Sequence, residues 1–295
     1  MQGWAGIDEF VAVAKTGSFS AAARLLGLST THMSRAVAGL EQRLETTLFN
    51  RTTRTVKLTD TGLLFYDHCQ RIVAERDEAI AMIHQGSEPQ GELRVTCSIA
   101  MGERFIVPII QEFALRNSRL TVAIDLTNRA VDLIGEGYDL AIRTGKLADS
   151  SLVATRIAAR TLATCASPAY LAQHGRPVRL EDLGAHDCVV SSSPLWHFQR
   201  GGRPAVFRPK GRWRCNSGVA AVKAAIAGLG LCQLPAFYVL PHIASGELEP
   251  LLASFTPEDE PIWAVYPQVR HAAPKITGLV DLLRQRLPAA LALTA

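Results

Sequence analysis

The sequence from Gly17 to Leu44 reads GSFSAAARLLGLSTTHMSRAVAGLEQRL, two short helical patterns separated by one glycine. Ser18 or Ser20 is placed to cap the first helix and Ser29 the second, since a side-chain oxygen at this position can accept from free backbone N–H groups. An amphipathic pattern from residue 7 to residue 16 precedes the stretch. Three successive short helices predict a small helical domain.

The third helix, expected from residue 30 to about residue 44, has two different faces. Apolar residues spaced by four and three predict its buried face: Met33, Val37, Leu40 and Leu44. The opposite face has no large apolar residue and carries Thr31, Ser34, Arg35, Ala38 and Gln42. Such a face suits the major groove of DNA, where residues near a helix N-terminus meet base edges. Periodicity alone fits a solvated face equally well.

Residues 48–58, LFNRTTRTVKL, follow this helix and lose the helical period. Their threonine and valine content predicts a hairpin with Arg54 near its tip. The segment 24–57 holds six basic and two acidic residues. This local positive charge favours phosphate contact, and an arginine-tipped wing can enter a minor groove.

A long helix is expected next, from about Asp60 to Gln85, with Thr59 as its cap. Its apolar residues are spaced mainly by fours and threes, interrupted by Arg76: Phe65, Cys69, Ile72, Ala79 and Ile83. This stripe favours pairing with another helix. Residues 86–91, GSEPQG, are typical of a hinge.

The remainder of the 295-residue chain alternates strand and helix patterns. The expected strands are ELRVTCS, LTVAIDL, YDLAIR and LCQLP, and the expected helices are ERFIVPIIQEFALR, RAVDLIGEG, GVAAVKAAIAG and residues 275–293. This order predicts an α/β domain with parallel strands.

Several classes of function are disfavoured by what the sequence lacks. It has no secretory signal pattern and no apolar run near 20 residues, so we expect a cytoplasmic protein without membrane contact. Six scattered cysteines without a C-x-x-C pair predict free, buried thiols. Hydrolase, phosphate-loop and zinc-binding motifs are absent, so we expect no catalytic residue, no metal site and no resident cofactor.

The motifs GSFSAAA, SRAVAGLEQRL, LFNRTTRTVKLT and the following TG, in this order, resemble the winged helix-turn-helix of LysR-type transcriptional regulators. DLAIRTG, CASPAYLAQHGRP and GLGLCQLP are similar to the subgroup with a LAIR strand. The resemblance implies a winged helix-turn-helix at 1–59, a linker helix and hinge at 60–90, and an effector-binding domain at 91–295. It also implies promoter DNA as partner, a homodimer through the linker helix, often a homotetramer, and contact with RNA polymerase.

The family's DNA-contact positions correspond here to Thr30, Thr31, Ser34, Arg35 and Arg54. Many members have Gln-Pro where this chain has Thr30-Thr31. Glutamine can bond adenine with two hydrogen bonds and threonine cannot, so the base preference at this point is open.

The resemblance also implies two α/β lobes like those of type-2 periplasmic binding proteins, with crossovers near Ala163–Thr164 and Val265–Tyr266. Lobe I would be 91–163 and 267–295, and lobe II 164–266. Ligands bind at the carboxyl ends of strands in such sheets. This rule and the helix starts in lobe II predict effector contacts at Ser98, Thr127, Asn128, Arg143, Ser167, Asn216 and Ser217.

The expected effector is a small organic molecule, and a helix N-terminus with an arginine suits an anion. Three simpler interpretations stand beside this one. Ser98 and Ser217 could serve simply as helix caps, Arg143 could serve simply as an ion-pair partner, and Trp196 and Phe198 favour core packing. A solute-binding protein and an interaction scaffold are the alternative functions.

Overall fold

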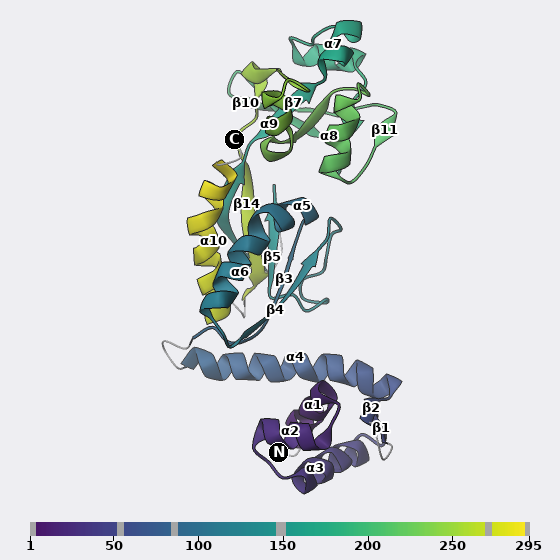
Figure 1. The fold of residues 1–295 in the computed structure, drawn as a ribbon, viewed down its shortest axis with the longest axis vertical. Coiled ribbons are helices and arrows are strands. Elements are labelled where there is room, and N and C mark those ends of the chain that lie inside the picture. The colour runs from purple at the N-terminus through teal and green to yellow at the C-terminus, as the bar shows by residue number, and fades with distance from the viewer. Residues whose placement is uncertain (1–3, 52–55, 84–87, 146–151, 269–272, 293–295) are drawn as a thin grey trace. The chain divides into compact units, whose positions relative to one another are not determined.

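The computed structural model describes residues 4–51, 56–83, 88–145, 152–268 and 273–292. The chain divides into two compact units, Met1–Ser87 and Glu88–Ala295, and the division falls at the expected hinge. The N-terminal unit contains α1 (Ile7–Thr16), α2 (Phe19–Leu26), α3 (Thr30–Arg43), β1 (Phe49–Arg51), β2 (Val56–Leu58) and α4 (Asp60–Ile83) (Figure 1).

Side-chain caps begin three of these helices, as the sequence predicts. The Ser18 hydroxyl accepts from Ala21 N at 3.4 Å, the Ser29 hydroxyl from His32 N at 3.1 Å, and Thr59 Oγ1 from Gly62 N at 2.9 Å. Ser18, rather than Ser20, is therefore the cap of α2. Gly27 ends α2 with a φ of 67°, a left-handed conformation that suits glycine.

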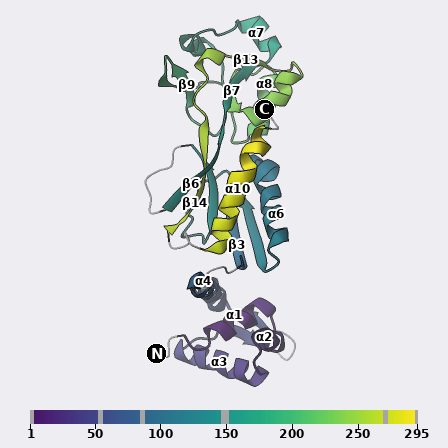
Figure 2. The same cartoon turned by 90° about the vertical axis from the view of Figure 1, so that its left-hand side faces the viewer.

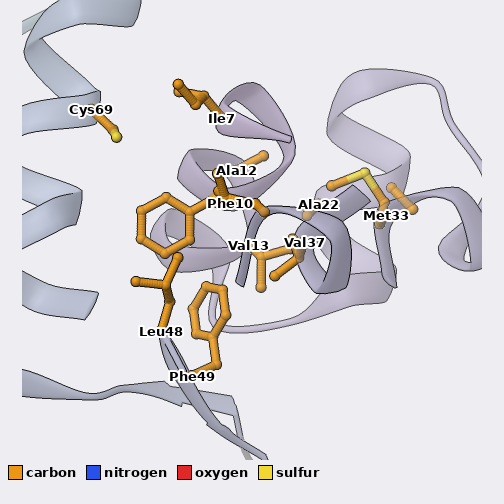
Figure 3. Packing of buried hydrophobic residues seen from close by; sticks show 12 residues of the cluster. Ile7, Phe10, Ala12, Val13, Ala22, Met33, Val37, Leu48, Phe49 and Cys69 are labelled. Carbon is orange, nitrogen blue, oxygen red and sulfur yellow. The ribbon is translucent and has the colours of Figure 1, made fainter. Parts of the chain in front are cut away.

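The core of this unit centres on Phe10, which has no exposed surface (Figure 3). Its ring contacts Phe49 of the hairpin at 5.3 Å and Phe65 of α4 at 5.3 Å between centroids. Cys69 of α4 is 1% exposed and belongs to the same core. The prediction that this apolar stripe of α4 pairs with another helix is thus partly wrong, because Phe65 and Cys69 pack against this unit's own helices.

Other residues of α3 and α4 refine the expected faces. Met33, Val37 and Leu40 are buried, whereas Leu44, at the end of α3, is 41% exposed. Arg76, which interrupts the stripe on α4, donates to Asp8 Oδ2 at 2.7 Å and so ties α4 to α1. Leu63, Leu64, Ile72 and Ile80 of α4 are exposed, so an apolar surface remains on this helix.

The C-terminal unit contains a five-stranded sheet in the order β4-β3-β5-β14-β6. Its strands are β3 (Gly91–Cys97), β4 (Leu120–Leu126), β5 (Leu140–Thr144), β6 (Leu152–Arg160) and β14 (Glu260–Pro267). Helices α6 (Val107–Arg116) and α10 (Pro274–Ala292) lie side by side along this sheet in both views (Figures 1 and 2). A short α5 (Ile99–Met101) and a π-helical turn (Gly102–Ile106) lead into α6.

The second lobe contains a three-stranded sheet in the order β12-β7-β13. Around it lie a parallel pair of β8 and β11 and an antiparallel pair of β9 and β10. The bounds are β7 (Leu162–Ala166), α7 (Pro168–His174), η2 (Leu180–Ala185), β8 (Val189–Val190), β9 (Trp196–Arg200), β10 (Arg203–Phe207), β11 (Trp213–Arg214), α8 (Gly218–Ile226), β12 (Cys232–Pro235), α9 (Ala236–Ala244), β13 (Glu249–Leu251) and η3 (Ala253–Phe255).

The structure corrects two boundaries between the lobes. The first crossover lies at Thr161, between β6 and β7, slightly before the expected Ala163–Thr164. The second does not lie at Val265–Tyr266, because β14 pairs with β6 from Glu260 to Pro267 and therefore belongs entirely to the five-stranded sheet. Lobe II thus ends before Glu260.

Two expectations for the α/β pattern are also corrected. RAVDLIGEG, residues 129–137, forms turns rather than a helix. Asp132 Oδ1 accepts from Gly135 N at 3.0 Å, and Gly137 has a φ of 72°, which a helix does not allow. The sheet is mixed, since β3 is parallel to β4 and β5 while β14 is antiparallel to β5 and β6.

Candidate DNA-binding helix and interlobe cavity

The outward face of α3 is exposed as predicted. Thr30, Thr31, Ser34 and Arg35 are all exposed, near the N-terminal end of the helix. Among the described residues, Arg35 has no ion-pair partner. The first two turns of α3 therefore present exposed hydroxyl groups and the Arg35 guanidinium on this face, and such groups can bond phosphates and base edges.

The wing is held against α3 by an acidic residue. Glu41 Oε1 accepts from Leu48 N at 2.8 Å and from Phe49 N at 3.2 Å, at the start of β1. One of the two acidic side chains in segment 24–57 is therefore turned inward to backbone groups. Arg54, the expected wing tip, lies outside the described residues.

Gly62 explains the TG of the motif. A Cβ at this position would lie 2.1 Å from the Leu48 carbonyl oxygen, so the start of α4 can approach the wing only through glycine. Thr59 Oγ1 donates to Thr47 O at 2.9 Å, while Thr59 N donates to Leu48 O at 3.0 Å. The motif therefore joins the wing to α4.

A cavity of about 250 Å³ lies between the two lobes of the C-terminal unit. Five of the seven predicted effector contacts line it: Ser98, Thr127, Asn128, Arg143 and Asn216. Ser98, Asn128 and Thr127 directly follow β3 and β4, and Arg143 lies near the end of β5. Because these three strands are parallel, their carboxyl ends meet at one edge of the sheet, as the strand-end rule predicts.

Ser167 and Ser217 do not line the cavity in this structure, and each caps a helix instead. Ser167 is 2% exposed and caps α7 by accepting from Tyr170 N at 3.4 Å. Ser217 caps α8 by accepting from Ala220 N at 3.4 Å. Both positions precede a helix for the ordinary reason that its first N–H groups need acceptors. Ser98 differs, because its side chain makes no capping bond in the described structure.

Three arginines line the cavity, and two of them are paired with glutamates. Arg129 Nη1 donates to Glu136 Oε1 at 2.7 Å, and Arg160 Nε donates to Glu260 Oε2 at 2.6 Å. The Arg129 partner also lowers the pKa of Glu136 to about 2. These four side chains largely neutralise one another.

Arg143 is the third arginine, and no carboxylate of the described residues pairs with it. Its guanidinium donates to Ile142 O at 3.1 Å and to Thr96 Oγ1 at 3.4 Å, both neutral acceptors. Burial lowers the pKa of Arg143, because the charged form loses water and this loss outweighs the attraction of nearby acidic groups such as Asp125. An arginine cannot be deprotonated in ordinary conditions, so a positive charge remains available in the cavity.

Asn128 connects the two lobes at the cavity. Its Nδ2 donates to Asn216 O of lobe II at 3.1 Å, and its Oδ1 accepts from Ile99 N of lobe I at 3.2 Å. The same side chain therefore contacts the start of α5 and the segment before α8. Any change in the separation of the lobes at this point must lengthen or shorten the Asn128–Asn216 bond.

The sequence reasoning missed several residues that lobe II contributes. Gln233 lines the cavity from β12, where its amide bonds His197 N and O at 2.8 Å each. A lone polar residue in the apolar run LCQLP was the available signal. Trp196 was expected in the core and is 1% exposed, yet it also lines the cavity. Its indole N–H has no partner among the described residues.

Two protein families match the chain. Residues 6–63 match the bacterial regulatory helix-turn-helix protein of the lysR family, and residues 86–288 match the LysR substrate binding domain. No described helix is both long and apolar enough to cross a membrane.

Relatives match along nearly the whole length. A helix-turn-helix transcriptional regulator of Haemophilus influenzae is 34% identical over 92% of this chain and 96% of the relative. The transcriptional activator AaeR of Escherichia coli K12 is 32% identical over 93% and 90%. The structure of CrgA, a LysR-type regulator of Neisseria meningitidis, has 31% identity and a TM-score of 0.57 over 95% and 97%. These relatives are transcriptional regulators and not enzymes.

Proposed function

Because the chain belongs to the LysR family of DNA-binding transcriptional regulators, we propose that its C-terminal unit senses a small organic anion in the interlobe cavity. The observation that carries this proposal is Arg143, which pairs with no carboxylate of the described residues. A half-buried guanidinium without a paired carboxylate is costly, and a bound carboxylate would supply both charge and acceptors.

The other polar groups of the cavity suit the same type of ligand. Ser98 and Thr127 offer hydroxyls at the strand ends, and the buried indole N–H of Trp196, a residue of the cavity wall, has no partner among the described residues. All of these groups can donate. Thr127 Oγ1 already accepts from Arg129 N at 3.3 Å, which leaves its O–H as the group available to a ligand. An acceptor-rich ligand such as a carboxylate is therefore favoured over a cation.

We further propose that the ligand acts by changing the separation of the lobes. The cavity has walls from both lobes, and Asn128 joins them by one hydrogen bond. A ligand that bonds both walls binds one separation better than another and shifts the population toward it. In a homodimer or homotetramer, such a shift would change the spacing of the two DNA half-sites.

The exposed apolar residues of α4 support self-association through this helix, namely Leu63, Leu64, Ile72 and Ile80. For the DNA contacts we propose Thr30, Thr31, Ser34 and Arg35 from α3, with Arg54 from the wing. RNA polymerase remains a proposed partner, supported only by the family's role in transcription. The LAIR strand (β5) and the CASPAYL segment before and in α7 support membership of the corresponding subgroup.

A thermal-shift screen of the full-length protein with mono- and dicarboxylic acids tests the effector proposal. A binding acid should raise the melting temperature, since ligand at about 100 times its Kd stabilises by about 2.7 kcal/mol. Arg143→Gln should weaken that acid about 10- to 150-fold, the cost of a charge-assisted bond. Arg119→Gln, at an exposed arginine outside the cavity, is the matched control. Equal binding by Arg143→Gln and wild type would show that the cavity is not the anion site.

A further inference from the structure

Positive charge is concentrated in one part of lobe II. From Cys188 to Gly246 the chain has no acidic residue and seven lysines and arginines, although the net charge of the whole chain is only +4. The rest of the chain is therefore net negative. Neither the effector cavity nor the DNA-binding helix α3 explains why the positive charge is concentrated in this part of lobe II.

Four of these cations occupy alternate positions of one segment, RPKGRWR, which covers residues 208–214, bends at Arg212 and ends in β11. All four are exposed: Arg208, Lys210, Arg212 and Arg214. We call these four residues the basic edge. Six residue steps span at most about 20 Å even in a fully extended chain. The four cations therefore lie close together at one exposed segment of lobe II.

Two of the three residues between the cations pack against the lobe. Pro209 is buried, and a Cβ at Gly211 would lie 2.0 Å from the Cys188 carbonyl oxygen, whereas Trp213 is 42% exposed. Cys188 N donates to Lys210 O at 2.9 Å, and β11 continues as the partner of β8. The backbone under the basic edge is thus held by hydrogen bonds, and Figure 1 shows β11 beside α8.

The side chains of the basic edge are not engaged in ion pairs within the described chain. None of its four side chains makes an ion pair with a described residue, whereas the nearby Arg200 pairs with Glu181. A single lysine is enough to protect an exposed strand from pairing with another chain. Four closely grouped cations instead create a positive potential that attracts a polyanion.

We propose that the basic edge is a second DNA-contact surface, which binds the phosphate backbone without reading sequence. Closely grouped cations suit the dense phosphate charge of a duplex, and three of the four are arginines, whose planar guanidinium suits phosphate. DNA is also the polyanion that this protein holds through its helix-turn-helix, so its local concentration at lobe II is high.

Salt-dependent binding of the full-length protein to a fluorescein-labelled mixed-sequence duplex of about 60 bp tests this proposal. Each phosphate contact adds about 0.9 to the slope of log Kobs against log salt, so R212Q/R214Q should lower the slope by up to about 1.8. Neutralising all four residues should lower it by up to about 3.6. The double variant R119Q/K223Q removes the same charge from exposed positions outside the basic edge and should leave the slope unchanged.

Lysine acetylation of the wild-type protein gives a second readout that involves no variant. With the duplex bound, Lys210 should be protected from acetylation, while Lys223 on α8 should react as in the free protein. The four-residue variant should melt like the wild type, because none of the four side chains contacts a described partner. Slopes equal to that of R119Q/K223Q, or equal acetylation of Lys210 with and without DNA, would overturn the proposal.

Discussion

Replacing Phe10 by alanine should strongly destabilise the DNA-binding unit and leave the stability of the effector unit unchanged. Phe10 is fully buried and is the residue through which α1 contacts both the wing and α4. Its ring lies 5.3 Å from the rings of Phe49 and Phe65 and 6.4 Å from that of Tyr66. No smaller side chain can maintain these three contacts.

The expected loss of unfolding free energy is about 3–5 kcal/mol, the usual cost of Phe→Ala in a core. Aromatic pairs contribute about 0.5–1.5 kcal/mol each beyond area burial, and three of them place Phe10 toward the upper end. Domains of this size have about 0.05–0.15 kcal/mol of stability per residue. The variant therefore loses a large part of the total, and its α3 cannot remain positioned for DNA.

Hydrogen exchange followed by mass spectrometry measures this loss unit by unit. Amides of α1 and α3 should lose about two to four orders of magnitude of protection in Phe10→Ala, since 1.4 kcal/mol corresponds to a factor of ten. Amides of β3 and β5 should keep theirs. Leu25→Ala, at a 60% exposed position of α2, is the matched control and should change protection by less than about 0.5 kcal/mol.

Two results would refute this reasoning. The first is a loss below about 1 kcal/mol in Phe10→Ala, which would mean that the ring is not the centre of the core. The second is an equal loss in the α1 and β3 amides, which would mean that the two units unfold as one.

Three further changes probe other parts of the chain. Gly62→Ala should lower the unfolding free energy of the N-terminal unit by at least about 1–3 kcal/mol, because the added Cβ would lie 2.1 Å from Leu48 O. Gly39→Ala, whose Cβ would meet only Arg43 Nη1 at 3.9 Å, should instead stabilise α3 by up to about 1 kcal/mol. Urea unfolding measures both changes. Ser29→Ala should lower the unfolding free energy by about 0.5–2 kcal/mol and lower DNA affinity, since it removes the cap of α3. An unfolding free energy equal to that of the wild type would contradict this. Burial raises the pKa of the Cys97 and Cys188 thiols to about 12, so little of their thiolate forms near pH 8. Iodoacetamide should therefore label the partly exposed Cys215 before these two. Labelling of Cys188 as fast as that of Cys215 would show that Cys188 is not buried.

Local patterns in the sequence predicted the helix boundaries well because caps and glycine stops act within a few residues. Ser18, Ser29 and Thr59 each bond the N–H groups of the next turn, and the sequence shows such neighbours directly. The strand-end rule also placed Ser98, Asn128 and Arg143 in one cavity, since it depends only on parallel strands.

Long-range packing explains what the sequence could not predict. Residues 260–267 form one strand pattern, and only pairing with β6 decides that all of it joins the first sheet. Phe65 and Cys69 have the spacing expected of residues that pair two long helices, but the same spacing also lets them pack on α1 and the wing. Trp196 reaches the cavity because the lobes face each other there, and no local signal in the sequence records that arrangement; for Gln233 the only local signal was a polar residue in an apolar run.

The neutralising pairs around the cavity were equally hidden from the sequence. Arg160 and Glu260 are 100 residues apart, and strand pairing brings them within 2.6 Å. The pairing of Arg129 with Glu136 depends on turns where a helix was expected. Only with both pairs known does Arg143 stand out as the cation without a described carboxylate partner.

Genome-wide mapping of the DNA bound by the wild type and by Arg35→Ala most directly tests sequence-specific recognition through α3. We predict a limited set of sharp sites upstream of genes for the wild type, sharing one sequence pattern with paired half-sites. Arg35→Ala, whose exposed side chain supports no part of the fold, should lose these sites while its melting temperature stays unchanged. Even coverage of the genome by the wild type, or the same sites in Arg35→Ala, would contradict this account.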